Sequence, residues 1–421
     1  MNVIVIGSGA REHAICRLIH KSPLCDKLYC FPGNYGISQI AECHELSSDQ
    51  EIIEKCKKIK PDLVIIGPED YLSRNLAGKL RKLNLNVFGP DSVGAQLESS
   101  KEFMKNFCST HGIPTASSKT FTSYESAKSY LENKYGSIVV KYDGLAAGKG
   151  VFVCENTNDA IEACKKIFLD KIFNNDFNKV VIEDFIKGKE LSFFTISDGT
   201  TALNFGSAQD YKRIGENDRG PNTGGMGTLS PAPLLLDKNL EEKIQKNIVD
   251  KTIDGLKKDK IDFQGVIFFG VIVDEFNNPF LLEYNTRFGD PEIQSISMRL
   301  KTDFLPLVHA TATKSLKYAN LEFFDDKRAV CLILATQGYP DSYPMETEIK
   351  NLHNFRNEND FYIFHAATKI HHDKILTTGG RVLSVVSLGD TYADCRSKVY
   401  EVASKIDWNF KYFRKDIGSN F

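Results

Sequence analysis

Short apolar runs alternate with helical stretches along the first 90 residues. The runs at residues 3–6, 27–31, 63–66 and 86–88 are bounded by glycine or proline, which predicts four strands. Between them, Ser48-Asp49-Gln50-Glu51 is a capping-box sequence, in which Ser48 and Glu51 satisfy each other's free N–H groups at the start of a helix. This alternation predicts an N-terminal doubly wound parallel sheet with ligands at the carboxyl ends of its strands.

The pattern becomes hairpin-like after a helix that we expect to end at His111, before Gly112. Strands are predicted at residues 138–142, 151–154, 180–185 and 191–197. Residues 209–230 then form a polar, glycine-rich segment without clear periodicity. A loop of that length inside a compact domain is usually a lid or a substrate loop.

Regular patterns return in the remainder of the chain. They predict a helix at 240–257, strands at 266–273, 280–284, 330–335 and 380–387, and a helix at 393–406. We therefore expect an α/β and α+β multidomain protein with three units: 1–100, a central unit 101–322 that includes a lid subdomain at 122–190, and a small C-terminal α/β unit at 323–421.

Composition narrows the classes of function. The formal net charge of −2 argues against a general nucleic-acid or membrane-surface binder, and no stretch approaches the roughly 20 apolar residues that span a bilayer. The chain opens directly on a strand-like run without a basic region or a cleavage site before it, so we expect no leader sequence. Ten cysteines lack C-x-x-C pairs and nine histidines lack metal-ligand spacing, so we expect free thiols and a cytoplasmic location.

Gly7-Ser8-Gly9-Ala10-Arg11-Glu12 partly matches a dinucleotide-binding fingerprint. Glu12 stands where the third glycine belongs, and no acidic residue ends the second strand, so NAD or FAD binding is disfavoured. Two interpretations stay open: a helix N-terminus that meets a phosphate with help from Arg11, or a turn without a ligand.

The segment from Asp143 to Gly150 is a small-residue loop between two predicted strands. It is not a P-loop, because its spacing is one residue short and Gly150 replaces the Ser or Thr that would bind Mg²⁺. Such a loop can donate backbone N–H groups to a polyphosphate. Lys141 ends the preceding apolar strand, where an unpaired ammonium is costly, so we expect an anion beside it. The alternative is a lysine that reaches solvent from an edge strand.

Glu283-Tyr284-Asn285-Thr286-Arg287 places three chemically useful side chains on one face of a strand. Residues i, i+2 and i+4 share a face, so Glu283, Asn285 and Arg287 would converge on one site. Glutamate and asparagine oxygens suit Mg²⁺, and an arginine beside them would stabilise transferring phosphoryl charge. The following Asp290 and Glu292 add two carboxylates, and the alternative is a solvated salt-bridged strand face.

These motifs together resemble the ATP-grasp superfamily and, within it, the family of glycinamide ribonucleotide synthetases, also called phosphoribosylamine–glycine ligases. The resemblance covers essentially the whole chain. Its motifs are, in order, Gly-x-Gly-x-Arg11-Glu12-His13, Pro32-Gly33-Asn34, Gly67-Pro68-Glu69, the loop at 143–150, Gly220-Pro221-Asn222-Thr223-Gly224-Gly225-Met226-Gly227, Arg287-Phe288-Gly289-Asp290-Pro291-Glu292, Gly379-Gly380-Arg381-Val382 and Arg414-Lys415-Asp416-Ile417-Gly418.

The resemblance implies a central ATP-grasp domain and the ligation of glycine to 5-phosphoribosylamine through glycyl phosphate, with ATP as co-substrate and Mg²⁺ or Mn²⁺ as metal. It implies catalytic roles for Arg287, Lys141 and Asp290, and metal ligation by Glu283 and Asn285. The implied ATP-binding residues are Lys101, Lys141, Gly144, Gly148, Lys149, Gly150, Glu183, Phe185 and Glu190. The implied residues for glycine and phosphoribosylamine are Gly9, Arg11, Glu12, Gly67, Glu69, Asp210, Asp290, Glu292 and Arg381. A transient contact with the enzyme that supplies phosphoribosylamine is a further expectation.

One position departs from the wider superfamily. Several ATP-grasp enzymes carry another acidic metal ligand on the strand before the Glu-x-Asn strand, where this chain has Val271, and Asp274 is expected in the turn. The alternatives are another ATP-grasp ligase that uses bicarbonate or a different amino acid, a dinucleotide-dependent oxidoreductase, and a nucleotide sensor. Intact Glu283, Asn285 and Arg287 argue against the sensor.

Overall fold

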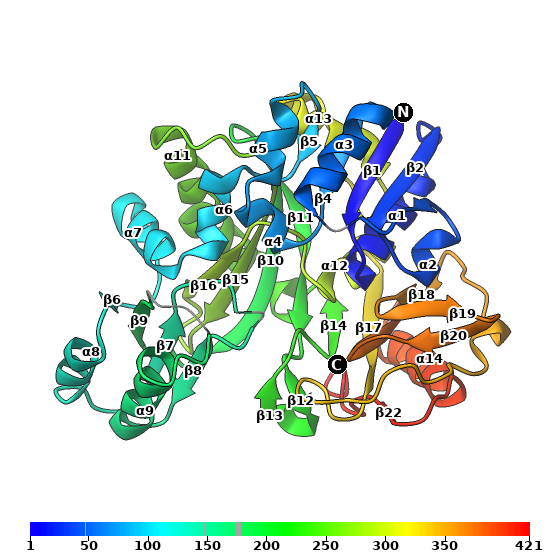
Figure 1. Cartoon of the computed structure of the whole chain (residues 1–421). Helices are drawn as coiled ribbons and strands as arrows, with labels where there is room; N and C mark the ends of the chain where they lie inside the picture. The colour runs from blue at the N-terminus through cyan, green and yellow to red at the C-terminus, as the bar shows by residue number, and fades with distance from the viewer. Residues whose placement is uncertain (47, 147, 174–177) are drawn as a thin grey trace.

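The computed structural model describes residues 1–46, 48–146, 148–173 and 178–421. Its N-terminal part is a parallel sheet in the order β3-β2-β1-β4-β5 (Figure 1). The strands are β1 (Asn2–Gly7), β2 (Lys27–Pro32), β3 (Glu42–Cys43), β4 (Leu63–Ile66) and β5 (Val87–Phe88). The helices are α1 (Ala10–His20), α2 (Tyr35–Ser38), α3 (Asp49–Ile59), α4 (Glu69–Ser73), α5 (Leu76–Arg81) and α6 (Ser92–Ser99).

Both faces of this sheet are covered, as predicted. Val3 and Val5 of β1 pack in the same cluster as Ala14 of α1, whereas Ile4 and Ile6 pack with residues of α3 and α5 on the other face. The capping box that starts α3 is confirmed, because Glu51 N donates to Ser48 Oγ and Ser48 N donates to Glu51 Oε2.

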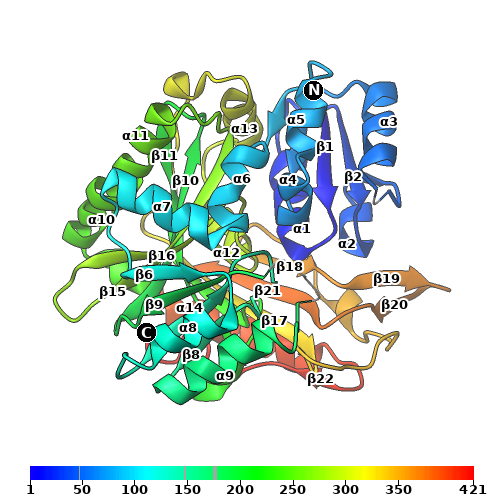
Figure 2. The ribbon, with the colours of Figure 1, turned by 60° about the vertical axis from the view of Figure 1, so that its left-hand side comes forward.

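A smaller antiparallel sheet, in the order β6-β9-β7-β8, forms a subdomain with its own core (Figure 2). Its strands are β6 (Ser118–Phe121), β7 (Ile138–Tyr142), β8 (Val151–Cys154) and β9 (Val180–Asp184), and helices α8 (Tyr124–Leu131) and α9 (Thr157–Phe168) pack on it. Helix α7 (Lys101–His111) precedes this unit, and it ends at Gly112 in a left-handed conformation, as the sequence predicts.

The third sheet runs through the rest of the molecule in the order β16-β15-β10-β11-β14-β17-β21-β18, with β22 paired to β17. Its strands are β10 (Lys189–Ser197), β11 (Ala202–Asp210), β14 (Gly227–Ser230), β15 (Gly265–Val273), β16 (Pro279–Asn285), β17 (Arg328–Thr336), β18 (Phe361–His365), β21 (Arg381–Gly389) and β22 (Lys411–Tyr412). Strand β14 joins the two halves, since it pairs with β11 on one side and β17 on the other.

Helices and short hairpins complete the fold. The expected helix at 240–257 is α10 (Lys238–Ile244), a π-helical turn (Gln245–Val249) and α11 (Asp250–Lys258). The others are α12 (Glu292–Arg299), α13 (Phe304–Ala312) and α14 (Tyr392–Lys405), and the hairpins are β12 (Arg213–Gly215) with β13 (Arg219–Asn222) and β19 (Thr368–His371) with β20 (Lys374–Thr377). Among the described residues, no helix is long and apolar enough to cross a membrane.

The segment at 209–230 is more regular than its sequence suggests. It contains the β12–β13 hairpin and strand β14. Residues 216–221 at the hairpin tip are exposed, so both of its faces are polar and the alternation that normally identifies a strand is missing.

Candidate active site

A cavity of about 1210 Å³ lies between the small antiparallel sheet and the large sheet, and it is also bordered by the N-terminal and C-terminal units. Most of the predicted site residues line it. These are Arg11, Glu69, Lys101, Lys141, Gly144, Gly148, Gly150, Glu183, Phe185, Glu190, Asp210, Glu283, Asn285, Arg287, Asp290, Glu292 and Arg381. Residues separated by up to 370 positions therefore meet at one place.

Four predicted residues do not line this cavity. Lys149 faces a neighbouring cavity, where its Nζ donates to Pro340 O at 3.3 Å. Gly9, Glu12 and Gly67 lie behind the wall, and Glu12 fills the space between them, because a Cβ at Gly67 would stand 2.0 Å from Glu12 Oε1. Ala147 of the 143–150 loop is outside the described residues.

The turn that starts α1 is closed to a phosphate, contrary to that interpretation of its sequence. Gly9 N donates to Glu12 Oε2 at 2.7 Å, and Arg11 N donates to Asp290 Oδ2 at 3.4 Å. Arg11 Nε also donates to Glu12 Oε1 at 2.5 Å. Carboxylates of the protein thus occupy the positive helix end, and Arg11 reaches the cavity as part of an internal charge network.

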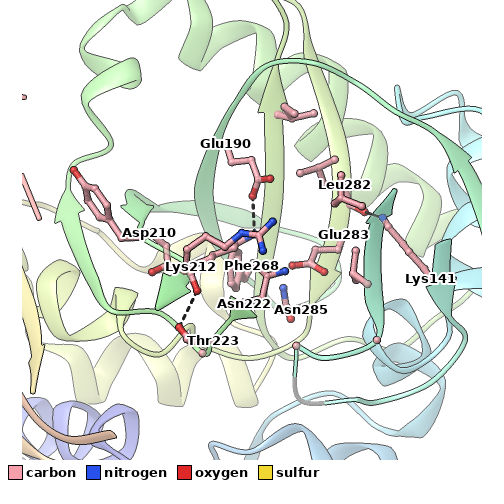
Figure 3. Close-up of a pocket in the computed structure, with 18 of the residues that line it drawn as sticks. Lys141, Glu190, Asp210, Lys212, Asn222, Thr223, Phe268, Leu282, Glu283 and Asn285 are labelled. Carbon is pink, nitrogen blue, oxygen red and sulfur yellow. Dashed lines mark hydrogen bonds and ion pairs between the residues drawn. The ribbon is translucent and has the colours of Figure 1, made fainter. Parts of the chain in front are cut away.

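Lys141 is buried in a charge cluster. Its Nζ lies 3.0 Å from Glu183 Oε1. It also donates to Leu282 O at 2.9 Å (Figure 3). Lys105 Nζ approaches the same Glu183 oxygen at 3.2 Å, and burial lowers the Lys105 pKa although Glu183 opposes this. The alternative of a lysine that reaches solvent is therefore wrong, and the anion beside Lys141 is the Glu183 carboxylate.

Lys212 is a cavity residue that the sequence did not single out. Its Nζ lies 2.7 Å from Oε2 of Glu190, one of the residues implied to bind ATP (Figure 3). Burial alone would lower the pKa of Lys212. The charges of Glu190 and Glu283 outweigh burial, so the pKa lies above the ordinary value of a lysine. The available signal was its position two residues after Asp210, which places a cation beside a predicted substrate carboxylate.

Glu283 and Asn285 lie side by side at the end of β16, as the strand spacing predicts (Figure 3). Burial opposes ionisation of Glu283, yet Lys212, Lys101 and Lys141 together lower its pKa, so the carboxylate is held ionised. In the neighbouring strand, Gly270 faces Glu283, and a Cβ there would lie 2.9 Å from Glu283 Cγ. An ionised carboxylate and an amide oxygen fit a hard cation that takes its other ligands from phosphates and water.

Strand β15 supplies no further acid to this pair. Val271 is fully buried and pairs with Leu281, and Asp274 accepts hydrogen bonds from Phe276 N and Asn278 N in the exposed turn. Across the described part of the chain, no cluster of three or more His, Cys, Asp or Glu side chains could hold a metal by itself.

Arg287 connects the N-terminal unit to β16. Its Nε lies 3.1 Å from Glu69 Oε2, and an NH2 nitrogen lies 3.1 Å from Glu98 Oε1 and 3.2 Å from Asn285 Oδ1. Glu98, which the sequence did not single out, is 5% exposed and also accepts from Thr286 N. Arg287 lowers the pKa of Glu69 to about 2, so this pair is ionised.

The remaining wall combines carboxylates with Arg381. The Arg381 guanidinium donates to Asp290 O at 2.7 Å and lies 3.5 Å from Asp290 Oδ1. Asp210 Oδ1 is buried without a hydrogen-bond partner, and Glu292 accepts from Ser192 Oγ at 3.1 Å. Burial raises the pKa of both Asp210 and Glu292, and the charge of Glu292 raises the pKa of Asp210 further. Such a pair suits a ligand that brings an ammonium or amine group.

Comparisons with known proteins agree along the whole chain. Family models match residues 1–98 (Phosphoribosylglycinamide synthetase, N domain), 99–293 (ATP-grasp (A) domain) and 329–420 (C domain). The phosphoribosylamine–glycine ligase of Agrobacterium fabrum is 43% identical over 420 residues, which is 99% of this chain and 98% of that one. The ligase of Caldanaerobacter subterraneus is 39% identical over 425 residues, all of both chains.

Solved structures similar to this chain include a phosphoribosylamine–glycine ligase. The phosphoribosylamine–glycine ligase of Thermotoga maritima superposes with a TM-score of 0.86 at 31% identity, over 99% of this chain and 100% of that one. The biotin carboxylase domain of Hydrogenobacter thermophilus 2-oxoglutarate carboxylase, solved with MgADP and bicarbonate, has a TM-score of 0.75 at 15% identity, over 98% of this chain and 91% of that one. The second likeness concerns the fold alone.

Proposed function

The chain belongs to the phosphoribosylglycinamide synthetase family, and we propose that the large cavity is the site at which it ligates glycine to 5-phosphoribosylamine. Glycine's carboxylate attacks the γ-phosphorus of ATP, the bond to the β–γ bridging oxygen breaks, and glycyl phosphate and ADP form. The amine of phosphoribosylamine then attacks the glycyl carbonyl carbon, loses a proton and expels phosphate. The product is glycinamide ribonucleotide, an intermediate of purine synthesis.

The nucleotide occupies the half of the cavity between the small sheet and β16. The backbone at residues 184–186 contacts adenine beside Phe185, and Glu190 contacts the ribose hydroxyls. Lys101 and Lys141 provide the positive charge for the phosphates, and Gly144, Gly148 and Gly150 close over them with backbone N–H groups. Lys149 reaches the phosphates only if it releases Pro340 O, to which it donates here.

Glu283 and Asn285 hold the divalent cation, Mg²⁺ or Mn²⁺, that accompanies ATP. When bound, such an ion neutralises phosphate charge and withdraws electrons from the transferring phosphoryl group. The support for this assignment is chemical: one ionised carboxylate and one amide oxygen leave room for phosphate oxygens, which Mg²⁺ commonly takes as ligands.

Arg287 stabilises the charge of the transferring phosphoryl group and of glycyl phosphate. Its ion pairs with Glu69 and Glu98 fix its position before the substrates arrive, so little reorganisation is needed during the reaction. Asp290 contributes by holding Arg381 and the backbone of Arg11 in place.

The substrate amines are received by the carboxylates on the remaining walls. The charge of Glu292 adds to burial in raising the pKa of Asp210, and a substrate ammonium would relieve that repulsion. Arg11, Glu69 and Arg381 face phosphoribosylamine. Gly9, Glu12 and Gly67 support this wall from behind, since Glu12 fixes Arg11 and needs the space that the two glycines leave.

The proposed function also includes the domain bounds, the cellular location and a partner enzyme. The units divide at 1–100, 101–322 and 323–421, with 122–190 acting as the lid. All ten cysteines are free thiols, which agrees with a reducing compartment such as the cytoplasm. The instability of phosphoribosylamine favours a transient contact with the enzyme that supplies it.

The observation that carries the proposal is the convergence of Glu283, Asn285 and Arg287 on one wall with Lys141 near them. The test measures ADP release from Mg-ATP with glycine and freshly generated phosphoribosylamine, supplied singly and together. The ligase assignment is supported if ADP and glycinamide ribonucleotide form only when glycine and phosphoribosylamine are both present. Turnover with bicarbonate or another acid instead would support the assignment of the ATP site and contradict the assignment of glycine and phosphoribosylamine as substrates.

A further inference from the structure

The β12–β13 hairpin begins immediately after Lys212. Its base is tied to the large sheet, because Tyr211 N donates to Gly227 O of β14 at 3.0 Å and Met226 N donates to Tyr211 O at 2.9 Å, but its tip extends away from that sheet. Its tip at residues 216–221 is exposed, and Asn217 and Asp218 have left-handed backbone angles, with φ of 56° and 52°. Segments with so few buried contacts open easily unless something fastens them. Lys212 O accepts from Thr223 N and from Thr223 Oγ1 at 2.8 Å each, so Lys212 and Thr223 close the base of the hairpin. What fixes the rest of the hairpin therefore adds to these bonds in positioning Lys212.

The fastening comes from the C-terminal segment at residues 412–418, some 200 positions later in the chain. Four hydrogen bonds cross between the two segments besides those of Arg414. Tyr412 OH donates to Ile214 O at 2.9 Å, Lys415 N to Glu216 Oε1 at 3.3 Å, Asn217 N to Asp416 Oδ2 at 2.9 Å, and Gly418 N to Tyr211 OH at 3.1 Å. Three of them hold the first strand and the tip of the hairpin, and the fourth holds Tyr211 just before it.

Arg414 is the centre of this attachment. Although charged, it is only 1% exposed. Its Nε and NH2 form a fork onto both oxygens of Asp416 at 2.8 and 2.7 Å, and its NH1 donates to Arg213 O at 3.0 Å and to Asp218 Oδ1 at 2.9 Å. The guanidinium also lies over the Tyr211 ring, 5.1 Å from its centroid. Arg414 thus contacts residues on both sides of Lys212.

We propose that Arg414 is a positioning residue for the ligase reaction, which acts through Tyr211 and Arg213 to hold Lys212 beside Glu190 and Glu283. This explains the Arg414-Lys415-Asp416-Ile417-Gly418 motif, whose residues do not line the cavity. A planar fork is required here, because a lysine ammonium cannot bond both Asp416 oxygens, Asp218 and the Arg213 carbonyl with one geometry. The inference rests on the proposed function, since its consequence is read in that reaction.

The chain provides a matched control. Arg396 also holds the C-terminal segment, with Nε donating to Ile417 O at 3.1 Å and NH2 to Lys415 O at 2.8 Å, and it lies over the Tyr400 ring. None of the contacts of Arg396 reaches the hairpin. Arg396→Met therefore loosens the same segment without removing the link to Lys212.

The experiment compares kcat and the KM for ATP in wild type, Arg414→Met, Arg414→Lys, Arg396→Met, Lys212→Met and the double variant Arg414→Met/Lys212→Met. Arg414→Met should lower kcat by about 10-fold to 100-fold, as expected for misplaced groups far from the bond change. The KM for ATP should change less than kcat, because the assigned adenine and phosphate contacts at residues 184–186, Lys101 and Lys141 remain, and only the ribose contact of Glu190 depends on its pairing with Lys212. Arg414→Lys should recover part of the loss, and Arg396→Met should resemble wild type.

The double variant decides whether the effect passes through Lys212. If it does, Arg414→Met adds little to the loss already caused by Lys212→Met. An equal loss in both backgrounds, or an Arg396→Met loss as large as that of Arg414→Met, would overturn the proposal. If Arg414→Met does not fold, Asp218→Asn replaces it; Asp218 is exposed, so this variant should fold and show a weaker form of the same loss.

Hydrogen exchange tests the attachment of the hairpin independently of whether the chain catalyses the proposed reaction. Amides at residues 213–222 should exchange faster in Arg414→Met than in wild type or Arg396→Met, while the core strands keep their protection. If wild type makes no glycinamide ribonucleotide, the proposed function fails and exchange alone tests the attachment. Unchanged exchange in an active enzyme would overturn the positioning role of Arg414.

Discussion

Replacing Arg287 with alanine should separate two effects that the structure combines in one side chain. The guanidinium pairs with Glu69 and Glu98 at 3.1 Å each, and Glu98 is 5% exposed. Removing one partner of a buried ion pair costs about 3–5 kcal/mol, because the other charge is left without compensation. The free energy of unfolding of Arg287→Ala should fall by about that amount, with Glu98 responsible for most of it.

The catalytic loss has a different origin. A preorganised donor aimed at developing charge is worth about 10²–10³ in kcat. ATP binding should be nearly unchanged, because residues 184–186, Lys101 and Lys141 keep their contacts. Glu98→Gln added to Arg287→Ala removes the uncompensated charge and still accepts from Thr286 N, so it should restore stability but not turnover.

Urea denaturation and single-turnover ADP release measure the two effects on the same samples. Turnover of Arg287→Ala close to that of wild type would remove Arg287 from the chemistry. Recovery of kcat in the Glu98→Gln/Arg287→Ala double variant would show instead that the loss came from misfolding.

Three further predictions concern pH, the lid and the metal. Burial lowers the pKa of His365 to about 4, so the unfolded chain binds a proton that the folded chain does not, and His365 should cost about 3 kcal/mol of stability as pH falls from 6.5 to 4. Burial also lowers the pKa of the neighbouring His13, so His365→Gln should remove part of this pH dependence in denaturation curves and exposed His20→Gln should remove none of it. Glu183→Gln should lower the free energy of unfolding, measured by urea denaturation, by about 3–5 kcal/mol, because it leaves two buried lysines without their carboxylate. The exposed control Glu155→Gln should leave the free energy of unfolding almost unchanged. Glu283→Gln should raise the Mg²⁺ concentration for half-maximal ADP release by about tenfold, and an unchanged midpoint would refute metal binding at that carboxylate.

Elements that bury an apolar run could be predicted from the sequence, because burial imposes the pattern from which they are recognised. The parallel sheet, the helix at 240–257 and strand β16 are of this kind. The β12–β13 hairpin could not be predicted, since its residues are fixed by polar contacts with a segment some 200 positions away. Periodicity carries no information about such contacts.

The site residues also separate into those that the sequence predicts and those that it does not. Glu283, Asn285 and Arg287 follow from strand geometry, because a two-residue period is a local property. Glu98 could not be identified, and Lys212 had only its position near Asp210 as a signal, since their significance lies in the partners that folding brings to them, Arg287 and Glu190. Glu12 was identified from its motif, but its contact with Gly9 N at the start of the helix could not be predicted.

Strand β14 makes the chain difficult to divide, although the family models separate an A domain from a C domain. It is four residues long and pairs with β11 through two residues and with β17 through four. A fragment that stopped before β17 would leave β14 as an unpaired edge next to buried apolar strands, which invites association with a second copy. Any fragment prepared for crystallisation, fusion or complementation should therefore keep β11, β14, β17 and β21 in one polypeptide.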